Sequence, residues 1–296
     1  MTPPTPLRYP ALNRAASKAS RTGQNRYMQA IRIRLIFLVL AAVGGAINWR
    51  VGSIEVLTWL ALVSFVIALA AEFVIFALRP DQLWYEGRAA AESAKTLTWR
   101  YAVAGDPFPA TLTNHAADTA FLTQLTAILR DLTISFPPPQ LEETHQITDE
   151  MRQLRALPFS ERKTAYLTGR IDDQQRWYGE KSRAAERYNS TFLLGAIALE
   201  FVGVIAATLR VTGIIDFDML GIVAALTAGI ASWAQTRQYG SITRAYSIAG
   251  NELTTIRSQA SLVDDSGWAR FVAEAEEAIS REHTLWRASR GVLGGS

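Results

Sequence analysis

The chain has 296 residues, 49% of them hydrophobic, and its 30 Lys and Arg against 27 Asp and Glu give a net charge of +3. This modest charge gives no reason to expect a nucleic-acid partner. The lack of cysteine excludes disulfides, thiolate metal sites and cysteine nucleophiles. Because the three histidines are scattered along the chain, we expect neither a metal site nor a cofactor.

The chain begins with a proline-containing basic segment, residues 1–22, which we expect to be a disordered tail. The first apolar stretch, 35–49, has no charged residue. As a helix it is about 22 Å long, short of the about 30 Å hydrocarbon core, but Ile31 and Ile33 extend it and Arg32 and Arg34 can snorkel. A cleavable signal peptide is the disfavoured alternative, because the basic segment is long and another apolar run follows at once.

Three further stretches, 54–78, 191–209 and 214–235, have the length and composition of membrane spans. Short turns join the first span to the second and the third to the fourth. The sequence therefore predicts an all-α membrane protein with four transmembrane helices arranged as two hairpins.

The distribution of basic residues predicts the orientation of these spans. Residues 1–34 hold seven basic residues and no acidic one, whereas the two hairpin turns hold only Arg50 and Arg210. Cytoplasmic segments are enriched in Lys and Arg. We therefore expect both termini and the central region in the cytoplasm.

The remaining segments predict long helices that extend the hairpins into a cytoplasmic helical bundle. Between the hairpins we expect helices over 81–104, 116–133 and 144–156, because Gly105-Asp106-Pro107-Phe108-Pro109 and Pro137-Pro138-Pro139 interrupt the pattern. Proline 80 should kink the chain or start a new helix. A heptad pattern over 160–190 predicts a helix that runs unbroken into the third span, to 209. The fourth span should continue to about Val263, and an amphipathic helix should follow over 267–290.

Both halves have the same order of elements: a long helix into the membrane, a tight turn, and a long helix out again. Such repetition indicates a duplicated two-span unit. The expected domains are a tail over 1–22, a first unit over 23–135, a Pro-rich connector and short helix over 136–158, a second unit over 159–290 and a tail over 291–296.

Two runs of residues carry a family resemblance. They are Trp84-Tyr85-x-x-Arg88-Ala89-x-Ala91-Glu92-Ser93-x-Lys95-Thr96-Leu97-x-Trp99-Arg100-Tyr101 and Phe159-x-Glu161-Arg162-Lys163-x-x-Tyr166-Leu167-x-x-Arg170-Ile171-Asp172-Asp173-Gln174-x-x-Trp177-Tyr178-x-x-Lys181-Ser182. With the hairpins that they flank, these runs resemble SLATT domains, the two-transmembrane effector modules associated with SMODS nucleotidyltransferases and SLOG nucleotide sensors. The chain looks like a tandem of two such units, over roughly 24–135 and 155–290.

The resemblance implies an oligomeric pore-forming or membrane-perturbing effector in an anti-phage conflict system. Its expected partners are the lipid bilayer, further copies of the chain and a nucleotide-signalling or sensor protein. No such module is attached here, which leaves the trigger open. Enzyme signatures are absent from the sequence, and the resemblance brings no catalytic residues, so we expect no enzyme. The alternative is a non-enzymatic membrane scaffold or sensor that recruits a cytoplasmic partner. A secondary transporter is disfavoured, because no pair of broken spans is visible.

Two acidic residues inside the spans are candidate functional residues. Glu200 lies at the middle of the third span, where an ionised side chain costs several kcal/mol unless it is paired, hydrated or protonated. In the functional interpretation it lines a water-filled path or titrates within an oligomer. In the structural interpretation it is protonated and hydrogen-bonded between helices. Glu72 can reach the inner interface or pair with Arg79.

Small residues give the third and fourth spans smooth faces, which favours helix packing within a hairpin or between protomers, with a pore lining as the alternative. These residues are Gly195, Gly203, Gly221, Ala225 and Gly229.

The resembling runs supply the remaining candidates: Trp84, Arg88, Glu92, Arg170, Asp173, Gln174, Trp177 and Tyr178. The aromatic residues favour core anchors over a ligand cage. The arginines favour ion pairs with Glu92, Asp172, Asp173 and Glu180 over a phosphate site. Asp172 and Asp173 lack partners at metal-ligand spacing.

Overall fold

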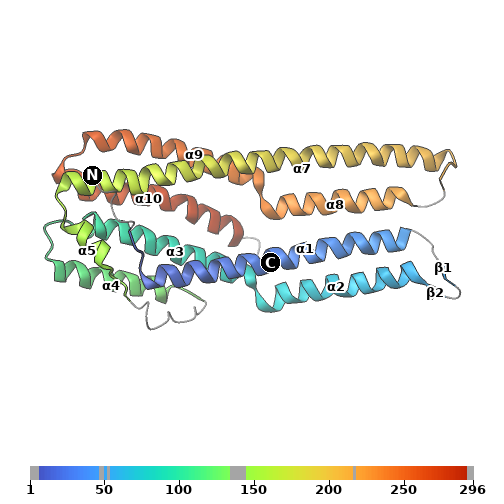
Figure 1. The fold of residues 1–296 in the computed structure, drawn as a ribbon, viewed down its shortest axis with the longest axis horizontal. Helices are drawn as coiled ribbons and strands as arrows, with labels where there is room; N and C mark the ends of the chain where they lie inside the picture. The colour runs from blue at the N-terminus through green and yellow to red at the C-terminus, as the bar shows by residue number, and fades with distance from the viewer. Residues whose placement is uncertain (1–6, 47–49, 52–53, 134–144, 216–217, 292–296) are drawn as a thin grey trace. The chain divides into compact units, whose positions relative to one another are not determined.

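The structure is a computed structural model that describes residues 7–46, 50–51, 54–133, 145–215 and 218–291 (Figure 1). In these ranges the regular secondary structure is helical apart from two strands of two residues each, so the predicted all-α class is confirmed. Four helices are long and apolar enough to cross a membrane, which makes this a multi-pass membrane protein.

The helices group into two compact units. Unit 1 holds the residues up to Gly23, Gln82–Lys181 and the residues from Ala245 onward, and unit 2 holds Gln24–Asp81 and Ser182–Arg244. Each unit therefore takes residues from both of the two-span segments that the sequence predicts.

Unit 2 contains the two predicted hairpins. In the first, α1 (Ala11–Ala46) leads through the antiparallel strands β1 (Arg50–Val51) and β2 (Ile54–Glu55) to α2 (Val56–Leu78). In the second, α7 (Asp173–Val211) leads to α8 (Met219–Arg237). The two strands pair Arg50 with Glu55, and Gly52-Ser53 between them lies outside the described residues.

Both returning spans end at a residue in the left-handed conformation. Arg79 ends α2 with φ 41° and Gln238 ends α8 with φ 52°. A new helix starts at the next residue in each case: α3 (Pro80–Ala102) and α9 (Tyr239–Gln259). The expected helix start at Pro80 is confirmed. The fourth span continues as helix to Leu262, close to the expected Val263, but the left-handed residue Gln238 breaks it, which was not expected. The same break at equivalent places in both halves agrees with a duplicated unit.

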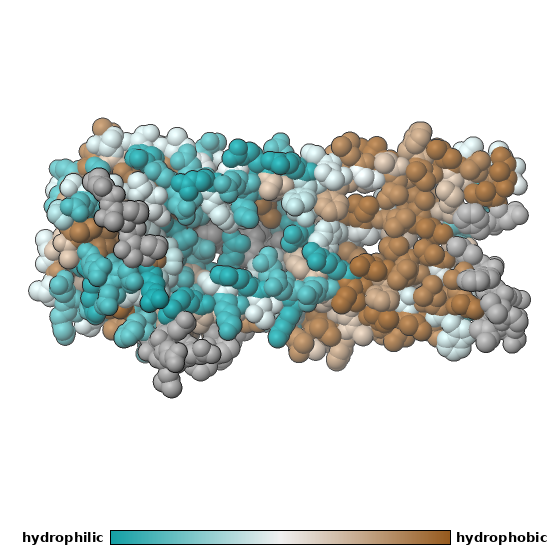
Figure 2. Space-filling model, in the orientation of Figure 1, coloured by the Kyte–Doolittle hydropathy of each residue, from teal (hydrophilic) through white to brown (hydrophobic). Residues whose placement is uncertain are grey.

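Large apolar side chains cover the outside of the spans. Phe76 is 79% exposed and Phe201 is 68% exposed, and Figure 2 shows hydrophobic residues gathered over the spans, whereas hydrophilic residues cover unit 1. Apolar surface of this extent is unfavourable in water and favourable in lipid. The exposed surface therefore fits lipid contact.

Unit 1 is built from the helical segments outside the spans. Besides α3 and α9 it contains α4 (Asn114–Arg130), α5 (Asp149–Ala156), α6 (Phe159–Tyr166), the π-helical segment η2 (Leu167–Asp172), the 3-10 segment η3 (Ala260–Leu262) and α10 (Asp265–Gly291). The helix from Phe159 to Val211 is continuous, as expected, but its π-helical turn was not expected. Of the helix expected over 144–156, the part from Asp149 to Ala156 is helical, whereas the described residues 145–148 are not.

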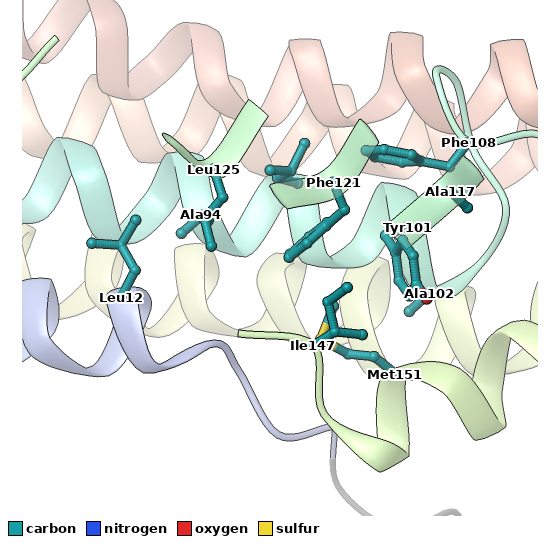
Figure 3. Packing of buried hydrophobic residues seen from close by; sticks show 11 residues of the cluster. Leu12, Ala94, Tyr101, Ala102, Phe108, Ala117, Phe121, Leu125, Ile147 and Met151 are labelled. Carbon is teal, nitrogen blue, oxygen red and sulfur yellow. The ribbon is translucent and has the colours of Figure 1, made fainter. Parts of the chain in front are cut away.

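An aromatic cluster forms the core of unit 1 (Figure 3). The rings of Tyr101, Phe108 and Phe121 lie 5.1 to 6.1 Å apart, and Met151 of α5 is buried with them. Leu12 of α1 belongs to the same cluster.

The first part of α1 contradicts the expected disordered tail. Residues 11–22 are helical, and Ala11, Leu12, Ala16 and Ala19 are buried. The spacing of these small side chains makes one apolar face, which the prolines and arginines nearby obscured in the sequence. A Cβ on Gly87 of α3 would lie 2.8 Å from the backbone N of Ser20, so the glycine allows α1 to approach α3 closely.

We expect Thr148→Ala to lower the free energy of unfolding by about 1 to 2 kcal/mol, because two hydrogen bonds are lost. The Thr148 hydroxyl accepts from Met151 N at 3.3 Å, which caps α5, and donates to Arg8 O at 3.1 Å. Denaturant unfolding of the detergent-solubilised protein measures the change. Thr164→Ala, which removes an exposed hydroxyl, is the control, and equal effects of the two variants would contradict the capping role.

Candidate functional site

Glu200 lies at an exposed position of α7, on a groove between α7 and α8 of unit 2. The groove has a volume of about 560 Å³. Its walls are small and apolar, with Gly203 and Ala207 on α7 and Ala224 and Ala228 on α8. The hydroxyl of Thr227, also in the lining, donates to Val223 O at 3.0 Å. Among the described residues that line this apolar groove, Glu200 is the one that carries a carboxylate.

Among the residues that the structure describes, none forms a hydrogen bond or ion pair with Glu200. Ionised carboxylates inside a membrane need a partner or water. A hydrogen bond to a neighbouring helix of the same chain was one alternative for this residue, and the described part of the chain supplies no such bond. The alternatives that stay open are hydration of the carboxylate by water, its protonation, and contact with a second copy of the chain.

Glu72 is paired within the first hairpin. Its Oε2 lies 2.8 Å from Nε of Arg34 on α1, and both side chains are partly exposed. The sequence suggested Arg79 as the partner of Glu72. The ion pair is with Arg34 instead, and Arg79 is the left-handed residue that ends α2. Because Glu72 faces α1 across the hairpin, its charge is neutralised there, which sets it apart from Glu200.

The small residues of the spans have several environments. A Cβ on Gly203 would lie 3.4 Å from Val223 Cγ1 of α8, and one on Gly229 would lie 3.4 Å from Val39 Cγ2 of α1, so these two glycines face neighbouring helices. At Gly221 the space is filled by Asp218, whose Oδ1 accepts from Gly221 N at 3.2 Å and caps α8. Ala225 is half-buried.

Gly195 has no atom within 4 Å of an added Cβ. Packing within the described chain therefore gives no reason for this glycine. A role at an oligomer face stays a prediction for it.

In unit 1, Arg170 is held in a buried ion pair that was not expected. Its Nη2 lies 2.7 Å from Oε2 of Glu276 on α10, and its Nε donates to Oε1 at 2.8 Å. The two side chains are 1% and 0% exposed. Tyr166 donates to the same carboxylate at 3.1 Å, and Gln174 accepts from Arg170 at 3.5 Å.

The charges of this buried group are coupled. Burial alone would lower the pKa of Arg170, but the carboxylate of Glu276 outweighs burial and raises the pKa above its usual value. Burial, together with the same carboxylate, raises the pKa of Tyr166 well above its usual value, so its hydroxyl stays a donor. Arg170 lies in η2, the π-helical segment, a feature often found at functional sites.

The other residues of the resembling runs pack or pair locally. Trp84 is buried, and the rings of Trp177 and Tyr178 lie 5.1 and 5.4 Å from that of Tyr246 on α9. These aromatic residues contact other rings, as core anchors do. Arg88 and Glu92 of α3 are half-buried.

The ion pairs expected for these runs were interhelical. Asp173 pairs instead with Arg176 of its own helix α7, at 3.4 Å on an exposed face. Asp172 pairs instead with Arg257 of α9 at 2.8 Å. Arg170, which lies in η2, pairs with Glu276 of α10 rather than with any of the four acids expected.

Sequence reasoning missed Glu276 as part of this core, whereas Trp268 belongs to the amphipathic helix predicted over 267–290. Trp268 is buried and its indole N–H donates to Val103 O at 2.7 Å. Glu276 lies four residues after Val272 and three before Ile279, on the apolar face of α10. A carboxylate on an apolar helix face was the signal that could have identified it.

A second cavity, of about 490 Å³, lies in unit 1. Tyr9 and Trp99 form an aromatic wall, and Glu150, Gln153 and Thr168 supply polar groups. Such a mixture suits a small molecule with hydrogen-bond donors. No group of three or more His, Asp or Glu side chains in the described ranges is placed to hold a metal ion.

Comparison with known families identifies two matched segments. Residues 10–163 match the family model described as SMODS and SLOG-associating 2TM effector domain 3, and residues 166–286 match domain 1 of the same description. The suspected tandem is therefore confirmed. No curated protein and no solved structure matches the chain.

Proposed function

Because the chain belongs to the SLATT family of two-transmembrane effector domains, known from conflict and anti-phage systems, we propose that it is a non-enzymatic bacterial inner-membrane effector that assembles into a homo-oligomeric pore. Four spans are too few to enclose a wide channel from one chain. Several copies are then required, with the spans of each copy contributing a segment of the wall.

The observation that supports this proposal most directly is the environment of Glu200. Its carboxylate lies in the middle of a span, in a groove that is otherwise apolar, and it has no partner in the described part of the chain. Lipid cannot solvate an ionised carboxylate. A water-filled space between copies would hydrate it, and the groove of small residues would let the helices of another copy approach closely.

The long helices offer a route from a signal to the spans. α1 has 36 residues and α7 has 39, and each contributes residues to both units. A nucleotide-signalling or sensor protein that binds unit 1, in the cytoplasm, would tilt or rotate these helices. Since the helices continue into the spans, the motion would change the Glu200 grooves.

The test is ion flux through Glu200 variants. We expect expression of the triggered wild type to collapse the membrane potential, Glu200→Leu and Glu200→Gln to abolish this effect, and Glu200→Asp to keep part of it. Glu186→Gln, which removes an exposed acid of α7 outside the apolar stretch, is the matched control. Membrane-potential dyes in cells and ion flux from liposomes with purified protein measure the effect. Full potential during triggering of the wild type would refute the pore.

The second candidate is a membrane-anchored scaffold or sensor, and the cavity beside Tyr9 and Trp99 is the observation that favours it. In that case the spans serve only as an anchor. Replacing α2 and α8 by unrelated apolar helices of equal length would then preserve activity, whereas a pore would not survive the exchange.

A further inference from the structure

Two arginines of unit 2 face the same tryptophan ring. Cζ of Arg32 on α1 lies 5.1 Å from the ring centroid of Trp233 on α8, and Cζ of Arg237 lies 5.5 Å from it. Arg237 also donates from Nε to the hydroxyl of Tyr239 at 3.2 Å. Cation–π contacts of this length hold both guanidinium groups at one ring.

In the part of the chain that the structure describes, no acid forms an ion pair with either arginine. Within the described ranges neither Arg32 nor Arg237 forms a salt bridge, whereas Arg34, two residues further along α1, is paired with Glu72. Two like charges at one ring repel each other, most strongly where lipid lowers the dielectric constant. An anion bound between the guanidinium groups would remove this repulsion.

Arg32 and the tryptophan, but not Arg237, also lie in the lining of an apolar groove. Arg32 and Trp233 line it together with Leu35 and Val39 of α1 and Leu226 and Ile230 of α8, and its volume is about 360 Å³. On α1 the groove extends from Arg32 to Leu40, about 12 Å along a helix axis. Because a cationic end adjoins an apolar groove, the site is complementary to a single ligand that has an anionic head and an apolar tail.

We propose that this site binds an anionic phospholipid, with the phosphate between Arg32 and Arg237 and an acyl chain in the groove. Guanidinium groups bind phosphate with two parallel hydrogen bonds. Basic pockets between transmembrane helices recognise anionic headgroups, and tryptophan prefers the headgroup level. A free phosphate would leave the groove empty, and an apolar helix of a second copy would leave the two charges unneutralised.

The proposal is tested by native mass spectrometry of the full-length protein in detergent with added phosphatidylglycerol or phosphatidylcholine of equal chain length. We expect wild type to retain phosphatidylglycerol about tenfold more strongly, since each arginine near a headgroup contributes to the preference. Arg32→Gln/Arg237→Gln should lose the preference. Arg187→Gln/Arg244→Gln, which removes two exposed arginines of the same unit, should keep it.

Two further variants test the charged end and the apolar groove of the site separately. Arg32→Lys/Arg237→Lys keeps the charge and should keep most of the preference. Leu226→Trp fills the groove and should weaken phosphatidylglycerol binding even if the arginine variants fail to fold. Equal retention of both lipids by wild type, or an unchanged preference in Arg32→Gln/Arg237→Gln, would overturn the proposal. So would displacement of the lipid by millimolar inorganic phosphate, which would assign the site to a free anion. None of these measurements depends on pore activity.

Discussion

Removing one partner of the buried Arg170–Glu276 pair should lower the free energy of unfolding by about 3 to 5 kcal/mol, because the other charge is left buried and uncompensated. Both side chains are almost fully buried and lie 2.7 Å apart. In Glu276→Gln the guanidinium of Arg170 loses its counter-charge. In Arg170→Met the carboxylate of Glu276 keeps only the hydroxyl of Tyr166 among the partners described here.

The double variant Arg170→Met/Glu276→Leu should recover most of the lost stability, since an apolar pair of similar volume can replace a buried ion pair. The same helix supplies a matched control. Arg270 and Glu274 lie 2.8 Å apart on the exposed face of α10, so Glu274→Gln should change the stability by less than about 0.5 kcal/mol.

Denaturant unfolding in mixed micelles, followed by near-ultraviolet circular dichroism, measures these differences. A loss in the double variant equal to the sum of the two single losses would show that the two side chains do not act as a pair.

The spans and the order of helices could be predicted from the sequence, because uncharged runs of membrane length are visible without any tertiary information. The helix breaks show the limit of this reasoning. Pro80 marks the break after α2, whereas Gln238 has no local signal. After Gln238, the ring of Tyr239 stacks on those of Phe192 and Tyr188, at 5.6 and 5.4 Å. Contacts with another helix, which the sequence does not show, accompany this turn.

The residues of the candidate site also differ in whether they could be predicted from the sequence. Glu200 could be identified from the sequence because a single acid interrupts an apolar run. The partner of Arg170 could not, since Glu276 lies 106 residues away and nearer acids offered plausible pairs. Likewise Arg32 was expected only to snorkel, and its position beside Trp233 and Arg237 depends on how α1 packs against α8. Residue type indicates the chemistry, but partner choice is a property of the packing.

The adjacent glycines of α1, Gly44 and Gly45, should respond oppositely to substitution. A Cβ on Gly44 would lie 2.6 Å from Leu57 O and 3.0 Å from Ala61 N on α2. These are backbone atoms, which no rotamer change can move. An added Cβ on Gly45 meets nothing within 4 Å. Gly44 is therefore the point where α1 and α2 approach each other, as small residues permit in membranes.

We expect Gly44→Leu to lower the free energy of unfolding by about 3 kcal/mol, at the upper end of overpacking effects, because the two helix backbones must separate. Gly45→Leu should leave the stability unchanged or raise it by up to about 1 kcal/mol, since leucine favours helix over glycine. Unfolding in mixed micelles measures both, with helical circular dichroism as the check on folding. Equal losses at both positions would mean that helix interiors here reject any larger residue. Equal tolerance would mean that α1 and α2 do not approach each other at Gly44.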